Sequence, residues 1–449
     1  MAQQQDHPRR NFRARRDILE ELSDAELLKR YRFDREGIMF ITDLVRDELQ
    51  SPTNRNVPIT PEMKVLMTLR YLATGKMQQC NSDDLGPSQP SVSNSITQTL
   101  HALTAPHLIK QFIKFPALHH HELARIAGEF RQVAGFPGVV GVIDGTHIRI
   151  IAPRRFEAEY VNRKNYHSVN VQIVFDAAYN ILNVVAKWPG STHDARIWQE
   201  SCLRMLFEHN RVPPGYHLLG DSGYPCKPYL LTPFLRPQPG PQANYNMAHK
   251  RTRNIVERGI GQLKRRFHVL HGEVRVSPAK TYRIVGACAI LHNICKARNI
   301  EIPADIDNLD EVVYAAEDDP IPFAFPAAAH QAGLQYRDAF ANTHFKSRSR
   351  SQLPLPLPAH EDPAAIPPVG VEETGVKVVQ FSGVANTSES LALLAKYCAV
   401  ITRVLINLTR RKHQLNLKPQ RPGEEMSQCE RGSGSVMVCE GKSQEWQYE

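Results

Sequence analysis

Hydrophobic positions between residue 12 and about residue 130 recur three and four apart, the spacing of buried helix faces. Ser23 and Glu26 have the spacing of a capping box at the start of one helix. Thr60 followed by Pro61 is typical of another helix start, and Gly75 is a suitable end for that helix. The pattern predicts an all-helical region over residues 1–130.

From residue 138 the pattern changes to that of strands. Residues 139–144 form a short apolar run rich in β-branched side chains, and apolar residues alternate over 169–175. A second β-rich run covers 181–188, and the short turn at 178–180 between the two predicts a hairpin. Further elements are a strand at 216–220 and helices at 194–206, 253–270 and 281–297. This order predicts an α/β domain over 138–300, with a mixed sheet flanked by helices.

The composition changes again after residue 300. Eight acidic residues and no Lys or Arg lie between Glu301 and Asp319, which sets off an acidic segment at 301–345. Residues 346–449 are rich first in Ser and Arg, then in Pro, and we expect this tail to be largely disordered. Within it, Leu391 to Leu408 could form one isolated amphipathic helix.

The overall composition excludes several classes of protein. No apolar run among the 449 residues is long enough to span a bilayer, and the basic amino end lacks the apolar stretch of a secretion signal. The eight cysteines contain no CxxC pair, so a zinc finger is not expected, and free thiols are the default. The formal net charge of +9 allows a nucleic-acid partner without establishing one.

Four carboxylates stand where a carboxylate is conspicuous. Asp144 and Asp221 each end an apolar strand, and Asp194 precedes a helix. Glu257 lies beside the buried stripe of the long helix, where Gly261 leaves open space one turn further on. Each has an ordinary alternative. Asp194 could be an N-cap, Asp144 and Asp221 could be turn residues, and Glu257 could pair with Arg253 or Lys264.

Together the four acids favour a metal site. Adjacent strand ends would bring several carboxylates together, and two like charges ~4 Å apart repel by about 4 kcal/mol at an effective dielectric near 20. A bound cation would relieve this repulsion. Oxygen ligands without Cys favour Mg²⁺ or Mn²⁺ over zinc, and a pair of such ions is the usual device for phosphoryl transfer.

Basic residues crowd the same part of the chain. Residues 250–283 contain ten Lys or Arg and only two acids. One interpretation is a solvated helix face. The other, favoured by the neighbouring carboxylates, is a track for the phosphate backbone of DNA that includes Lys264, Arg265 and Arg266.

Five motifs, in order along the chain, resemble the Harbinger transposase-derived nucleases, which belong to the PIF/Harbinger group of DDE transposases. The resemblance extends from about residue 10 to about residue 340. The 35 residues between Asp221 and Glu257 also resemble the last interval of many DDE enzymes. The motifs are Asp-Gly-Thr-His-Ile at 144–148, Gly-Ser-Thr-His-Asp-Ala-Arg-Ile-Trp at 190–198, Gly-Asp-Ser-Gly-Tyr at 220–224, Val-Glu-Arg-Gly-Ile-Gly-Gln-Leu-Lys-Arg-Arg-Phe at 256–267 and Ala-Cys-Ala-Ile-Leu-His-Asn at 287–293.

The resemblance implies an RNase H-like catalytic domain and a divalent metal bound by Asp144, Asp194, Asp221 and Glu257. Asp144 and Glu257 belong to the minimal triad, and whether Asp194 or Asp221 completes it is left open. The expected activity is hydrolysis of DNA phosphodiester bonds to a 3′-hydroxyl and a 5′-phosphate. The alternatives are a domesticated DNA-binding or adaptor protein with little or no cleavage, and an active transposase with strand-transfer activity.

The helical region also resembles these proteins, which carry a helix-turn-helix at about residues 82–104. A turn at 83–86 would precede a helix at 91–103, whose core face is Val92, Ile96, Leu100 and Leu103. Ser91, Asn94, Ser95 and Gln98 would face DNA. Relatives often carry a basic residue where this chain has Asn94, which argues for weaker DNA binding. The alternative is a plain helical packing module.

The resemblance also suggests partners and a location. Relatives commonly work with a separate Myb-like DNA-binding protein that helps them into the nucleus. We therefore expect a nuclear protein with some cytoplasmic pool, with DNA and a Myb-like protein as partners, no membrane association and a homo-oligomer left open. Three neighbouring histidines at 119–121 cannot converge on one ion from a helix, so they are interpreted as surface residues.

Overall fold

The computed structural model describes residues 16–53, 58–302 and 327–346. The chain divides into two compact units, 1–353 and 354–449, and all of the described residues belong to the first. The predictions for residues 303–326 and for the tail, including the helix at 391–408, lie outside the described residues.

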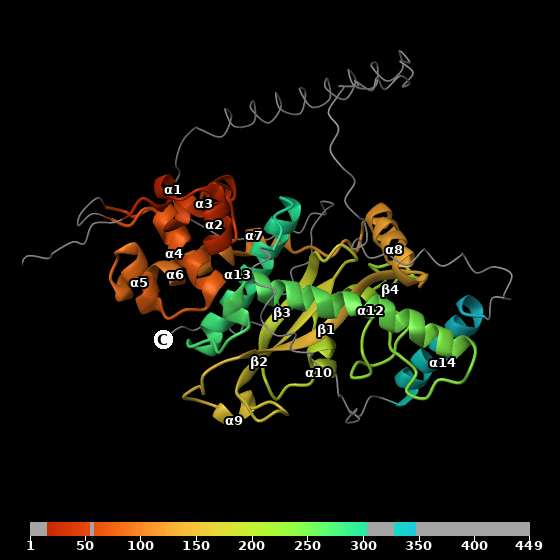
Figure 1. Cartoon of the computed structure of the whole chain (residues 1–449). Helices are drawn as coiled ribbons and strands as arrows, with labels where there is room; N and C mark the ends of the chain where they lie inside the picture. Colours follow the sequence, from red (N-terminus) through yellow and green to blue (C-terminus); the bar gives the residue numbers. More distant parts are fainter. Residues whose placement is uncertain (1–15, 54–57, 303–326, 347–449) are drawn as a thin grey trace, which may run out of the picture. The chain divides into compact units, whose positions relative to one another are not determined.

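The first part of the chain is helical, as the spacing of apolar residues predicts (Figure 1). Ser23 and Glu26 form the predicted capping box, and the Thr60 side chain accepts a hydrogen bond from the Met63 amide. Gly75 ends its helix with a left-handed φ of 65°, a conformation that glycine adopts without strain. The helices are α1 (Ile18–Glu21), α2 (Asp24–Tyr31), α3 (Arg35–Leu49), α4 (Pro61–Thr74), α5 (Gln78–Leu85), α6 (Gln89–Leu103), α7 (Pro106–Phe112) and α8 (His120–Ala134).

A five-stranded mixed sheet follows. Its strands are β1 (Val139–Arg149), β2 (Ser168–Phe175), β3 (Ile181–Pro189), β4 (His217–Leu219) and β5 (Leu230–Leu231), in the order β3-β2-β1-β4-β5. β1, β2 and β3 pair antiparallel, which confirms the predicted hairpin. β4 pairs parallel to β1, and β5 parallel to β4. β1 is therefore central, and whatever it carries lies between β2 and β4.

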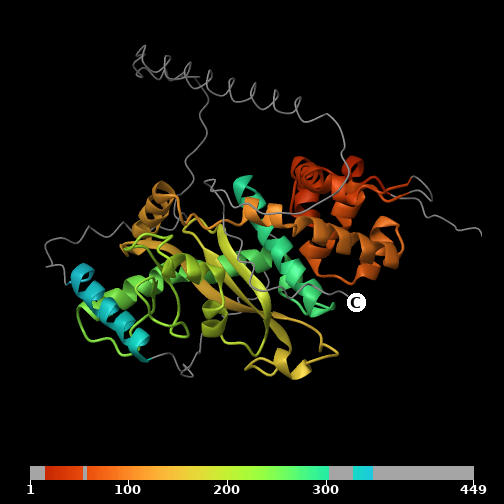
Figure 2. The same ribbon diagram turned by 180° about the vertical axis from the view of Figure 1, so that it is seen from behind.

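Helices cover this sheet (Figures 1 and 2). The long helix α12 (Pro241–Arg266) crosses β1 and β2, and Gly259 allows its backbone to approach the Phe175 ring closely. α13 (Pro278–Ala297) packs on β3 and on α6, so it joins the sheet to the helical region. The remaining elements are α9 (Glu157–Tyr160), α10 (Asp194–Gln199), α11 (Cys202–Glu208), the 3-10 turn η1 (His268–Leu270) and α14 (Ala327–His344).

Several predicted boundaries were wrong. The single helix expected at 194–206 is two helices, because Ser201 interrupts the first and caps the second by accepting a hydrogen bond from the Arg204 amide. α12 begins at Pro241, twelve positions before the predicted start, and ends at Arg266. β1 continues to Arg149, so Asp144 lies within the strand and does not end it. The short strand β5 was not predicted.

One continuous hydrophobic core runs through the described residues, from Ile18 in α1 to Phe345 after α14. Phe136 lies within it, in contact with rings from β4, α12 and the end of the described chain, including His217, Tyr245 and Phe340. The helical region and the sheet therefore share one folded body. Over the part of the chain that the structure describes, no helix is both long and apolar enough to cross a membrane.

Candidate active site

The four predicted acids come from four elements around the central strand. Asp144 projects from the middle of β1, and Asp221 follows the end of β4, the parallel neighbour of β1. Asp194 is the first residue of α10, whose N-cap is His193, so the alternative that Asp194 is itself the N-cap was wrong. Glu257 lies on α12, which crosses β1.

Asp144 carries the clearest electrostatic signal of the site. The pKa of its carboxyl is raised to about 8, chiefly by burial and also by the negative charges of Asp221 and Asp194, against the opposing effect of Arg253. The backbone amide of Gly145 donates to Asp144 Oδ1 at 2.9 Å. Three of the predicted acids therefore lie close enough to act on one another in a partly desolvated space.

Asp194 is held against the backbone of β1. A Cβ built on Gly145 would meet the Asp194 carboxylate at 2.3 Å, so glycine is required for this approach. Asn170 on β2 donates through Nδ2 to Asp194 Oδ1 and to the Thr192 carbonyl, both at 2.8 Å. The same amide thereby fixes both the carboxylate and the loop that leads to it.

Arg253 is the positive charge among these acids. Its guanidinium donates to Asp144 Oδ2 at 2.8 Å and to Glu257 Oε1 at 2.8 Å. The Asp144 and Arg253 side chains are 14% and 15% exposed, whereas Glu257 is 47% exposed. The ion pair with Arg253 that was considered for Glu257 is thus present. The same guanidinium also pairs with the buried carboxylate of Asp144.

The donor set fits a hard divalent cation. The carboxylates of Asp194 and Asp221 lie near enough to Asp144 to shift its pKa. Asn170 adds a buried Oδ1 that has no hydrogen-bond partner among the described residues. Oxygen donors of this kind suit Mg²⁺ or Mn²⁺. Within the described part of the chain, however, no three His, Cys, Asp or Glu side chains already stand in the arrangement of a metal site. Metal binding would therefore require side chains to move, Arg253 first among them.

Tyr224 is buried beside the acids. Its ring packs on Gly220, and its hydroxyl donates to Gln172 Oε1 at 3.4 Å. Burial raises the pKa of this hydroxyl well above its ordinary value, and the charges of Asp194, Asp144 and Asp221 add to the effect. Tyr224 therefore remains protonated and adds no charge beside the carboxylates.

The structure treats the three basic candidates of α12 differently. Lys264 and Arg266 are only 6% and 2% exposed. Lys264 Nζ donates to the His147 carbonyl at 3.1 Å, and Arg266 to the Ile300 carbonyl at 2.9 Å. Both serve here as buried donors to backbone, and their contact with DNA stays a prediction. Arg265 is exposed, and its contact with DNA stays a prediction.

The helix-turn-helix segment has the predicted core. Val92, Ile96, Leu100 and Leu103 are fully buried in α6. Asn94 and Gln98 are exposed, and Ser91 is half-buried, with its hydroxyl 3.0 Å from that of Ser88. The prediction that Ser95 lies on the same polar face was wrong, because Ser95 is buried. The turn lies at 86–88, after α5, because residues 83–85 still belong to that helix. Contact of this face with DNA is untested.

Three residues of the site were not predicted as functional: Arg253, Asn170 and Tyr224. The sequence did contain a signal for Asn170. Asn170 and Gln172 stand at alternate positions of an otherwise apolar strand, so their side chains lie on the same face and make part of it polar. Arg253 left none beyond its spacing to Glu257. His147 and His193, which flank the acids, contact Ser168 and Arg163 respectively. The histidines at 119–121 are exposed, as predicted.

Comparison with known proteins places these residues in a family. A model of the DDE superfamily endonucleases matches residues 143–293, the range that holds all four acids. The human protein named "Putative nuclease HARBI1" is 35% identical over 287 residues, which is 63% of this chain and 81% of that protein. This chain belongs to the Harbinger transposase-derived nuclease family.

Other relatives agree with this assignment. The mouse protein of the same name is 35% identical over 65% of this chain and 85% of its own length. A plant relative, "Protein ALP1-like" of Arabidopsis thaliana, is 26% identical over 59% of this chain and 69% of that protein. No solved structure matches the chain. Membership of the family gives a nuclease of transposase origin as the general type of protein.

Proposed function

We propose that this chain is a divalent-metal-dependent endonuclease that hydrolyses DNA phosphodiester bonds. The observation that carries the proposal is the gathering of Asp144, Asp194 and Asp221 around one partly desolvated space, where burial and the neighbouring acids raise the pKa of Asp144 to about 8. Such repulsion costs stability unless positive charge offsets it, and a bound divalent cation would offset it together with Arg253.

The residues of the site would divide the work. Asp144, Asp194, Asp221 and Glu257 would hold the metal, with Asn170 orienting Asp194. Bound there, Mg²⁺ or Mn²⁺ supplies activation of the attacking water and stabilisation of the leaving oxygen. Arg253 would exchange its carboxylate partners for the scissile phosphate, which it can bind through two parallel N–H groups. Tyr224, buried beside the acids, would keep water from that side of them.

The sheet supports an RNase H-like fold for this domain. β1, β2 and β3 form an antiparallel meander, and β4 and β5 continue the sheet parallel to β1. This arrangement puts acids from β1 and from the loop after β4 side by side. The proposal extends to a nuclear protein with some cytoplasmic pool that acts with a Myb-like DNA-binding partner.

The test is cleavage by the full chain of supercoiled and linear DNA with Mg²⁺ or Mn²⁺. Asp144→Asn and Glu257→Gln remove two proposed ligands, and Glu122→Gln, an exposed carboxylate on α8, is the matched control. Metal-dependent nicking by the wild type and Glu122→Gln, with a loss of at least 100-fold in both site variants, is expected. Equal products from all four proteins would contradict the proposal, and joining of cut ends to target DNA would indicate strand transfer.

One observation favours a second candidate, a DNA-binding adaptor without cleavage. Arg253 already neutralises Asp144 and Glu257 at 2.8 Å, so the folded site does not require a metal for charge balance. In the same assay an adaptor would bind DNA equally well as wild type and as Glu257→Gln and would leave it intact. The absence of nicking even after addition of a Myb-like partner would favour this candidate.

A further inference from the structure

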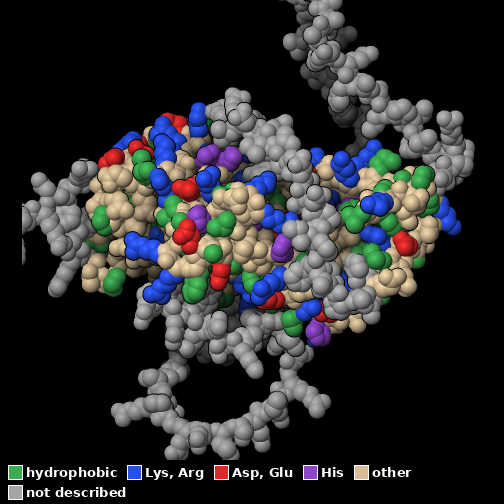
Figure 3. Space-filling view, turned by 90° about the horizontal axis from the view of Figure 1, so that it is seen from below, with side chains coloured by type: hydrophobic (Ala, Val, Ile, Leu, Met, Phe, Trp, Pro, Cys, Tyr) green, Lys and Arg blue, Asp and Glu red, His purple; other side chains and the backbone are tan. Residues whose placement is uncertain are grey.

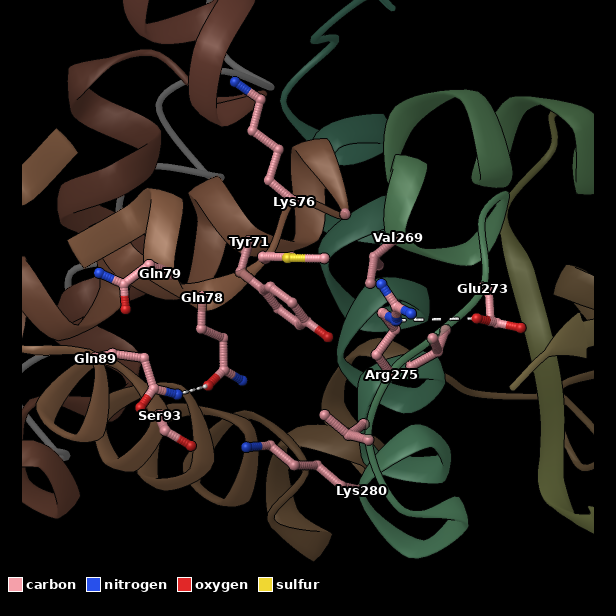
Figure 4. Close-up of a pocket in the computed structure, with 14 residues that line it drawn as sticks. Tyr71, Lys76, Gln78, Gln79, Gln89, Ser93, Val269, Glu273, Arg275 and Lys280 are labelled. Atoms are coloured by element: carbon pink, nitrogen blue, oxygen red, sulfur yellow. Dashed lines mark hydrogen bonds and ion pairs between the residues drawn. The ribbon is translucent and has the colours of Figure 1, made fainter. Parts of the chain in front are cut away.

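A groove of about 750 Å³ lies away from the acids, between the helical region and the segment that joins η1 to α13 (Figure 4). Tyr71 of α4, Gln78 of α5, and Gln89 and Ser93 of α6 line one side. Val269, Arg275 and Lys280 line the other. Its walls therefore come from parts of the chain almost two hundred residues apart.

Cations and neutral hydrogen-bonding groups line the groove, together with the apolar side chains of Met77 and three valines. Lys76, Arg275 and Lys280 contribute positive charge, against the single acid Glu273. Glu273 is shared, at 3.9 Å from Arg275 and 3.7 Å from Arg149. Gln89 Nε2 donates to Gln78 Oε1 at 3.3 Å on one side of the groove. The net positive charge and the donors suit an anion with several oxygens.

Lys280 is the most informative of these cations. It is half-buried, and Nζ donates to the Thr97 hydroxyl of α6 at 2.7 Å. Burial lowers the pKa of its ammonium, and no carboxylate contributes to the shift. A partly desolvated ammonium paired only with a hydroxyl retains attraction for an external anion.

The groove is continuous with the polar face of α6. One turn beyond Lys280, the Arg283 guanidinium donates to Thr104 of α6 at 3.3 Å, so two cations of α13 border that helix. The pKa of His101, on the exposed face, is lowered by burial and then by Arg283 and Lys280, so the positive potential reaches that face. Asn94 and Gln98 lie exposed on the same helix.

We propose that this groove seats the sugar-phosphate backbone of DNA, with Lys280, Arg275 and Lys76 contacting phosphates while the exposed face of α6 lies against the duplex. The inference rests on the proposed function for its choice of DNA as the anion. α13, which carries Lys280, packs on both α6 and β3. The groove therefore lies where the helix-turn-helix joins the sheet. On the face seen in Figure 3, basic side chains are spread among acidic ones, and further stretches of DNA backbone would find cations there.

The test measures binding alone. Fluorescence anisotropy with a labelled duplex is followed over a range of salt concentrations, and every protein is the full chain carrying Glu257→Gln so that DNA is not cut. Lys280→Gln, Arg275→Gln and Lys76→Gln each remove one groove cation. Lys110→Gln removes an exposed cation on α7 outside the groove and is the matched control. Lys280→Arg retains the charge.

Each groove variant is expected to weaken binding about 3- to 10-fold and to reduce the slope of log K against log salt by about one. Lys280→Arg should keep most of the slope, and Lys110→Gln should change neither quantity by as much as half. Equal effects of the groove variants and Lys110→Gln would overturn the inference. If Lys280→Gln lowers the melting temperature, its weaker binding is not counted, because the fold has changed. The result for Lys76→Gln, at an exposed position, then decides whether the inference stands. If the groove variants weaken DNA binding but the wild-type chain never cuts DNA, the proposed nuclease activity is refuted. The inference about the groove is then still supported.

Discussion

At the scale of single residues, the most consequential side chain is Arg253. It places one positive charge between a buried carboxylate and an exposed one, and it opposes the rise in the pKa of Asp144. Removing one partner of a buried ion pair is more costly than the pair is stabilising, because the other charge remains buried.

Arg253→Ala should therefore lower the free energy of unfolding by roughly 1–3 kcal/mol, since Asp144 loses its partner. Added Mg²⁺ should raise the melting temperature of this variant more than that of the wild type, because a cation at the acids replaces the lost charge. Arg258→Ala, at an exposed position of the same helix, is the control and should change stability by less than about 0.5 kcal/mol. Equal responses to Mg²⁺ in both variants would show that Arg253 does not compete with the metal.

At the scale of elements, the packing of α12 on the sheet decides where Glu257 lies. Gly259 faces the Phe175 ring, and a Cβ there would lie 3.0 Å from three ring carbons. Gly261, half a turn on, has nothing within 4 Å of such a Cβ, as the sequence predicted. Two glycines of one helix thus have opposite roles.

Gly259→Ala should destabilise the protein by about 1–3 kcal/mol, because overpacking against a fully buried ring outweighs the gain in helix propensity. Gly261→Ala should instead stabilise it by up to about 1 kcal/mol. Chemical denaturation of both variants measures the two signs. Stabilisation by both substitutions would mean that α12 can move away from β2 without cost.

α14 makes one very close approach to the loop between β4 and β5. A Cβ on Gly333 would lie 1.9 Å from the Cys226 carbonyl oxygen, too near for any side chain. Gly333→Ala should release α14 and expose Phe340 and Phe345, seen as faster proteolysis within residues 327–346. Ala339→Ser, at an exposed position of the same helix, should leave proteolysis unchanged. Unchanged proteolysis in Gly333→Ala would show that the backbone adjusts locally.

At the scale of the whole molecule, buried neutral histidines link stability to pH. Burial lowers the pKa of His217 to about 3 and that of His249 to about 4, and His344 and His249 face His217 with further positive charge when protonated. The unfolded chain binds protons near the ordinary pKa of about 6.5. Stability from the neutral rings is therefore present above pH 6.5 and is lost as the pH falls toward 3.

The free energy of unfolding should fall between pH 7.5 and pH 5, by about 2 kcal/mol from His217 alone. His217→Phe keeps a ring among its aromatic neighbours and removes this titration, so its stability should depend less steeply on pH. Thermal melts at pH 5 and pH 7.5 measure the difference. Parallel pH profiles for the two proteins would mean that His217 titrates alike in the folded and unfolded states.

The sequence by itself determined the class of fold, the helical region and the four acids. Short-range patterns carry this information: alternation over 169–175, caps at Ser23 and Thr60, and carboxylates directly after or within apolar runs. Local spacing also placed the core face of α6 correctly, because a helix repeats its buried positions over a few residues.

Only the tertiary structure decided which charges meet. The bond from Arg253 to Asp144 spans 109 positions, and that from Lys280 to Thr97 spans 183, distances over which no periodicity extends. Burial of Lys264 and Arg266 likewise depends on the elements packed over α12. A run of basic residues has the same sequence whether its side chains are solvated or donate to backbone carbonyls. The packing of whole elements decides which distant charges pair, whereas the sequence shows only which residues are able to form such pairs.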